Sequence, residues 1–124
     1  MKEKTIKLTA KEEEVMVHFW SKGKLFVKDL LECYEEPKPH FNTLSTVVRG
    51  LEVKGFLDHK AYGGSYQYFP AISLDDFKSR SLRGLLNKYY NNSLTAAVSA
   101  LVETKEISSD ELSELMELVE KNID

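Results

Sequence analysis

A short predicted helix in the first half of the chain carries small polar side chains and one cation on a single face. At 100° per residue, this face and its flanks consist of Asn42, Thr43, Ser45, Thr46 and Arg49. Short hydroxyl and amide groups can reach base edges and phosphates in the DNA major groove, and an arginine can bind a guanine or a phosphate. The plain alternatives are a solvated surface arginine and a threonine that caps the helix. The pattern favours DNA contact, with a phosphate as the expected partner of Arg49.

The opposite face of the same helix is apolar. Its residues recur at spacings of three, four and seven and are Leu44, Val47, Val48 and Leu51. This pattern predicts a helix over residues 41–54 that buries one face in a core and presents the polar face to solvent. Lys54 at its end and Lys60 shortly afterwards add two cations that we also expect to contact DNA.

A tight hairpin is predicted directly after this helix. Residues 56–62 and 66–72 read as strands on either side of Gly63-Gly64-Ser65, whose glycines can adopt the positive φ angles of hairpin turns. Tyr66 and Tyr68 fall on one face of the second strand, where packing against the helices is expected over contact with DNA. A helix followed by such a hairpin is typical of a winged helix.

Two further helices are predicted before this unit. Thr9 and Glu12 have the spacing of a capping box, and Gly23 is expected to end the helix that they begin. A second helix is predicted over residues 27–35, and Pro37 prevents its continuation. Three short helices followed by a hairpin give a mainly α fold with a small β-hairpin, in the order of a winged helix-turn-helix over residues 1–72.

Residues 73–124 are predicted to be helical throughout. Three apolar stripes recur at helical spacing, and the side chains expected to form a dimer interface are Leu82, Leu85, Leu86, Tyr89, Leu94, Val98, Leu101, Leu112, Leu115, Met116 and Val119. About 50 residues bury too little apolar surface to be stable alone. We therefore predict that this segment is a dimerisation domain, which would also place two reading helices on a palindromic site.

The net charge of −3 is unusual for a DNA-binding protein. Residues 1–71 hold 11 Lys/Arg and 10 Asp/Glu, a balance of +1, whereas residues 72–124 hold 6 and 10, a balance of −4. The DNA hypothesis therefore depends on local clustering of cations rather than on total charge. Because no apolar run approaches the roughly 18 residues of a membrane span and no secretory signal is present, we expect a cytoplasmic protein without membrane insertion.

The residue types that support enzymatic or metal chemistry are poorly placed. The three histidines and the single Cys33 show no metal-ligand spacing, and Cys33 is expected to be a small packed residue. No nucleophile–base–acid set or phosphate-binding glycine loop is found. The sequence therefore predicts no metal, no cofactor and no enzymatic activity.

Several of these segments together resemble one known family. The matching pieces are Leu8-Thr9 with Glu13, Val15, Met16 and Trp20, then Thr43-Leu44-Ser45-Thr46-Val47-Val48, then Leu51 with Lys54-Gly55-Phe56-Leu57-Asp58-His59-Lys60, and finally Ser108-Ser109-Asp110-Glu111-Leu112. Over nearly its full length the chain resembles the BlaI/MecI/CopY family of bacterial repressors. The resemblance implies a winged-helix DNA-binding domain, a helical dimerisation tail, and repression from a palindromic operator in double-stranded DNA, as for antibiotic-resistance or stress genes.

In the penicillinase-repressor branch, the resemblance also implies relief of repression by a regulatory protease linked to a membrane β-lactam sensor. The Asn-Phe cleavage pair of that branch aligns here with Ala100-Leu101. The family often has an arginine immediately before the leucine equivalent to Leu51, whereas this chain has Gly50 there and its cation at Arg49. The tail contains no cysteine, which excludes the copper-sensing chemistry of another branch.

Three other functions are compatible with parts of the pattern. A winged helix used only for protein interaction would fit the weak net charge, and a ligand-responsive regulator would need an apolar pocket. A thiol enzyme would require Cys33 to be reactive towards alkylating agents in the native state.

Overall fold

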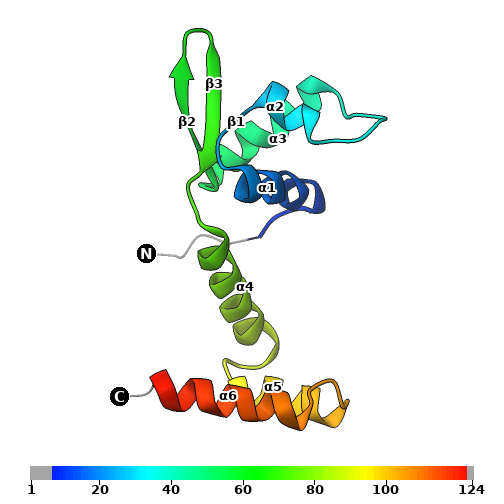
Figure 1. Cartoon of the computed structure of the whole chain (residues 1–124), viewed down its shortest axis with the longest axis vertical. Helices are drawn as coiled ribbons and strands as arrows, with labels where there is room; N and C mark the ends of the chain where they lie inside the picture. Colours follow the sequence, from blue (N-terminus) through cyan, green and yellow to red (C-terminus); the bar gives the residue numbers. More distant parts are fainter. Residues whose placement is uncertain (1–6, 123–124) are drawn as a thin grey trace. The chain divides into compact units, whose positions relative to one another are not determined.

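The computed structural model describes residues 7–122 (Figure 1). In chain order its elements are α1 (Ala10–Lys22), β1 (Leu25–Phe26), α2 (Val27–Glu32), α3 (Phe41–Val53), β2 (Leu57–Tyr62), β3 (Ser65–Pro70), α4 (Leu74–Tyr89), α5 (Leu94–Glu103) and α6 (Ser109–Asn122). The chain divides into two compact units, Met1–Ser81 and Leu82–Asp124, and α4 continues from the first into the second.

The first helix begins and ends where the sequence predicts. The Thr9 hydroxyl accepts a hydrogen bond from the backbone N–H of Glu12 at 3.1 Å, and the Glu12 carboxylate accepts one from the N–H of Thr9 at 2.9 Å. Gly23 ends the helix at φ 91°, a conformation that L side chains rarely adopt. The predicted capping box is therefore confirmed.

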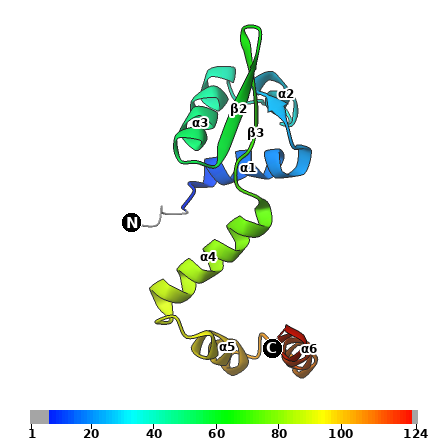
Figure 2. The same ribbon diagram turned by 90° about the vertical axis from the view of Figure 1, so that its left-hand side faces the viewer.

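The sheet contains one strand more than the predicted hairpin. Its order is β1-β3-β2, with antiparallel pairing throughout, so that β3 lies between two neighbours. The register sets both Leu25 of β1 and His59 of β2 opposite Tyr68. Gly63 has φ 60° in the turn between β2 and β3, and the hairpin extends beyond the helices of its unit in both views (Figure 1, Figure 2).

The core of this unit joins the apolar face of α3 to α1, α2 and the base of the hairpin. Its buried members are Val15, Met16, Phe19, Leu25, Val27, Leu30, Leu44, Val48, Leu51, Phe56, Leu57 and Tyr68. Three of the four apolar residues predicted on α3 are wholly buried, and Val47 is partly buried against the same cluster. The indole N–H of Trp20 donates to the carbonyl of Ile72 at 2.9 Å, which ties the end of the hairpin to α1. The architecture is a winged helix, mainly α with a small antiparallel sheet.

The second helix is shorter than predicted. It ends at Glu32 rather than Glu35, because the N–H of Cys33 turns to the carbonyl of Leu30 at 3.0 Å in a tighter, three-residue turn. Cys33 is partly buried, and its thiol lies 3.5 Å from the carbonyl of Asp29.

Helices α5 and α6 begin at serine caps. Ser93 caps α5, and Ser108 forms a capping box with Glu111 at the start of α6. Within residues 82–122, the part of this unit that the structure describes, no side chain is fully buried. The helices of the second unit therefore present their apolar stripes to solvent in a single chain.

Candidate nucleic-acid interface

The polar residues predicted for the helix over residues 41–54 lie together on the outer face of α3. Asn42, Thr43, Thr46 and Arg49 are exposed, and Ser45 is half-buried. Because Leu44, Val48 and Leu51 anchor the opposite face in the core, this orientation follows from the apolar stripe. The structure thus brings five of the seven proposed DNA-contacting residues onto one helix face.

Arg49 is well placed to bind an anion. Its guanidinium lies 3.5 Å from the hydroxyl of Thr46, a contact at the limit of hydrogen bonding, and that hydroxyl donates to the carbonyl of Asn42 at 3.0 Å. No carboxylate of residues 7–122 forms an ion pair with Arg49. Its N–H donors are therefore available to a phosphate or a base edge.

The other two proposed cations lie in different surroundings. Lys54, just after α3, forms an ion pair with Glu12 of α1 at 2.6 Å. Burial alone would raise the pKa of Glu12, but its bonds to Lys54 and Thr9 and the charge of Lys54 outweigh this and lower it. Lys60 is exposed on β2, with its ammonium 5.7 Å from the ring centre of Tyr62. Lys54 therefore links two helices, whereas Lys60 lies on the hairpin.

An open groove of about 320 Å³ separates the first part of α3 from the hairpin turn. Its polar and aromatic lining includes Lys28, Phe41, Ser45, Arg49, Ser65 and Tyr66. Two cations and two serine hydroxyls at one groove suit a chain of phosphates. Lys28 and Ser65 were not predicted as contact residues, because the pairing of β1 with β3 that joins these segments is not visible as a local pattern.

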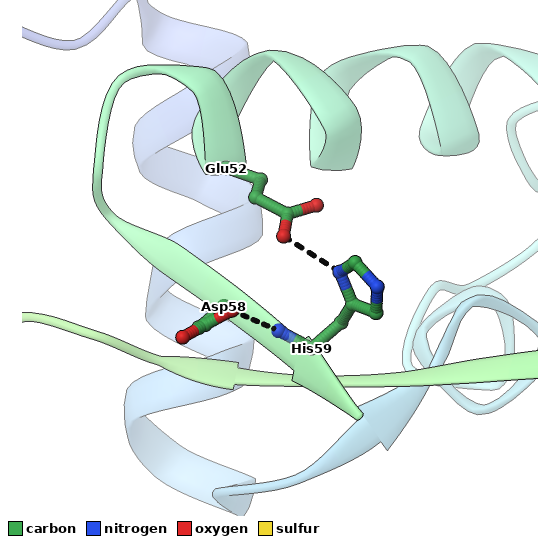
Figure 3. A group of neighbouring side chains, drawn as sticks. All are labelled: Glu52, Asp58 and His59. Atoms are coloured by element: carbon green, nitrogen blue, oxygen red, sulfur yellow. Dashed lines mark hydrogen bonds and ion pairs between the residues drawn. The ribbon is translucent and has the colours of Figure 1, made fainter. Parts of the chain in front are cut away.

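A cluster around His59 joins α3 to the hairpin (Figure 3). The Nδ1 atom of His59 lies 2.6 Å from a carboxylate oxygen of Glu52, and the backbone N–H of His59 donates to Asp58 at 2.8 Å. Ligand atoms of these three residues lie within 4.8 Å of one another. Asp58 already accepts a hydrogen bond from a backbone N–H, and Glu52 is already paired with Nδ1 of His59, so the arrangement fits hydrogen-bonded side chains better than a metal centre.

The two tyrosines of β3 differ in their surroundings. Tyr68 is buried in the core, and burial, followed by the negative charge of Glu52, raises its pKa. Tyr66 is half exposed, and its ring stacks on His59 with centroids 4.2 Å apart. Both tyrosines line the groove, but only Tyr68 is buried in the core of the unit.

The residues proposed for dimerisation lie on α4, α5 and α6. The exposed ones are Leu82, Leu85, Tyr89, Leu94, Leu101, Leu115, Met116 and Val119. Leu86, Val98 and Leu112 are half-buried. The proposed cleavage pair, Ala100 and Leu101, lies inside α5 near its end. None of the helices in residues 7–122 is long and apolar enough to cross a bilayer.

Comparison with known proteins identifies the family. A family model described as "Penicillinase repressor" matches residues 8–121, which is nearly the whole chain. The chain belongs to the penicillinase repressor family. This match confirms the family resemblance found in the sequence. The predicted winged-helix fold is confirmed as well.

Members of this family and one solved structure show how far the similarity extends. The methicillin resistance regulatory protein MecI of Staphylococcus aureus (strain N315) is 29% identical over 122 residues, covering 98% of this chain and 99% of that protein. The penicillinase repressor of Bacillus licheniformis is 26% identical over 112 residues, covering 90% and 88%. The archaeal chromatin protein TrmBL2, with a TM-score of 0.50 at 21% identity, shares the fold over 94% of this chain, which spans only 38% of that protein.

Proposed function

We propose that this protein is a transcriptional repressor that binds a palindromic operator as a homodimer. The observation that carries the proposal is the exposed polar face of α3, where Arg49 lacks an acidic partner among residues 7–122 and borders a groove that Lys28 also lines. Membership of the penicillinase repressor family supports it. A family of repressors also argues against a catalytic role.

In this proposal α3 enters the major groove and the hairpin follows the DNA backbone. The major groove is about 12 Å wide and admits a single helix. Asn42, Thr43 and Thr46 would reach base edges or phosphates from the exposed face, while Arg49 holds a phosphate. Ser45 lines the protein's own groove between α3 and the hairpin turn. Lys60 on the hairpin adds a further backbone contact, and Lys54 contributes mainly by fixing the end of α3.

The second unit would supply the dimer interface. The exposed apolar side chains of α4, α5 and α6 leave a surface that a second copy of the same unit could cover. We place the functional division after residue 72, between the end of β3 at Pro70 and the start of α4 at Leu74, although the compact units divide after Ser81, inside α4. Two reading helices held in this way would bind inverted half-sites.

Relief of repression is proposed to occur by proteolysis of the tail at Ala100-Leu101, by a protease linked to a membrane sensor. Proteases bind their substrates extended, so the end of α5 must open before cleavage. Leu101 is 42% exposed, which favours access once the helix opens. The names of the relatives point to antibiotic-resistance genes as the regulated class.

Salt-dependent DNA binding tests the proposed function. The intact protein is titrated into a fluorescently labelled duplex of mixed sequence at increasing salt, with the matching single strand as control. We expect tighter binding to the duplex and a log–log slope of about −0.9 for each phosphate neutralised. The alternative of a protein-interaction module predicts no such affinity, and that result would contradict the proposal.

A further inference from the structure

The ring of His59 makes contacts on both sides. On one side its Nδ1 atom is bonded to Glu52, in the last turn of α3, at 2.6 Å. On the other it stacks on Tyr66 of β3, with an interplanar angle of 22°, and it lies 5.4 Å from the ring centre of Tyr68. The side chains of His59 and Glu52 are 30% and 29% exposed, so water competes only partly for the bond.

Because of the position of His59 along the hairpin, a small change in these contacts would move the hairpin turn. Leu57 is buried at the base of β2, whereas residues 60–62, beyond His59, are exposed. At about 3.3 Å per residue, the turn at Gly63 lies roughly 13 Å further out, so a tilt of about 10° at His59 moves it by roughly 2 Å. A shift of this size is enough to break a hydrogen bond to a phosphate.

The hairpin has anchors other than this contact. Phe56, Leu57 and Tyr68 fix the base of the hairpin in the core, and the backbone ladder between β2 and β3 extends to the turn. The bond between His59 and Glu52 is thus available to set the direction of the hairpin without being needed to form it.

We propose that His59 is a positioning residue that fixes the hairpin against α3 through Glu52 and Tyr66, and so sets its contact with the DNA backbone. This inference rests on the proposed function. The bond requires a proton on Nδ1, whether the imidazole is neutral or charged, because the carboxylate can only accept. Nitrogen NMR of the imidazole should therefore show a protonated Nδ1 in the wild type. In Glu52→Ala the proton should no longer be held on Nδ1 in preference to Nε2.

The test compares three variants of the intact protein on a duplex selected for binding from a random pool. His59→Phe keeps an aromatic ring on Tyr66 but loses the bond to Glu52, and Glu52→Ala removes the same bond from the other side. Glu52→Gln keeps an acceptor for Nδ1 and serves as the matched control. We expect His59→Phe and Glu52→Ala to weaken binding about tenfold, and Glu52→Gln to stay near the wild type.

Hydroxyl-radical footprinting separates a positioning role from a general loss of structure. Protection at the positions covered by the hairpin should fade in His59→Phe and Glu52→Ala, while protection by α3 persists. Unchanged affinity and footprint in both variants, on a duplex that the wild type binds, would overturn the inference and leave the proposed function intact. A wild type that selects no duplex would instead refute the proposed function.

Discussion

Arg49 and Lys54 provide a matched test of how α3 meets DNA, because both are cations near its polar side but only Lys54 has an acidic partner among the described residues. We compare Arg49→Ala with Lys54→Ala in the intact protein. Removing Arg49 from both protomers of a dimer removes two phosphate contacts and should make the log–log salt slope shallower by about 1.8. Over a fourfold rise in salt, the wild type should then lose about 12-fold more affinity than the variant.

Lys54→Ala should act mainly on stability. Its ion pair with Glu12 spans 2.6 Å and is partly shielded from water, with side chains 39% and 13% exposed. A loss of about 0.2–1 kcal/mol in the free energy of unfolding is expected, with a smaller change in salt slope than for Arg49→Ala.

The assay is fluorescence anisotropy across a salt series on the selected duplex, with urea denaturation of each variant to compare folding. Arg49→Ala should unfold at the same urea concentration as the wild type, because its side chain is exposed and its one hydrogen bond within residues 7–122 is weak. An unchanged dissociation constant and slope for Arg49→Ala would refute the assignment of Arg49. A slope change as large for Lys54→Ala would refute the proposal that Lys54 acts mainly by fixing the end of α3 through Glu12.

Three further outcomes are expected. Leu51→Ala, at a wholly buried position of α3, should cost about 2–5 kcal/mol of unfolding free energy by urea denaturation, and a cost below 1 kcal/mol would contradict the packing described. Because the pKa of Glu12 is lowered from 4.5 in the folded protein, its charge stabilises the fold above that pH and ceases to do so as the pH falls through the folded value. Glu12→Gln should therefore be less stable than the wild type at neutral pH but equally stable in acid, whereas a difference that persists in acid would exclude this linkage. Met116→Asp, at a side chain 66% exposed on α6, should shift sedimentation equilibrium from dimer towards monomer, and an unchanged dimer would place the interface elsewhere.

The parts of the fold set by local patterns could be predicted from the sequence. The stripe Leu44, Val48 and Leu51 defined the buried face of α3, and the Thr9 capping box and the glycines of the hairpin turn marked where elements begin and end. These features depend on residues within one or two helical turns of each other.

The features that sequence reasoning missed are non-local. Strand β1 is only two residues long, and its partner in β3 lies more than 40 residues later, so no local pattern indicates it. The bond from Lys54 to Glu12 spans 42 positions, and it gives a proposed DNA-contacting residue an intramolecular partner. His59 and Glu52 lie seven residues apart on either side of the turn after α3, so their contact belongs to no single helix or strand pattern.

The central claim is that two copies of this chain read a symmetric DNA site through α3. Selection of bound duplexes from a random pool by the intact protein tests it most directly. We predict recovery of inverted repeats whose half-site centres lie about one helical turn, or a multiple of it, apart. A pool that gains no common sequence, or a single half-site without an inverted partner, would contradict the account.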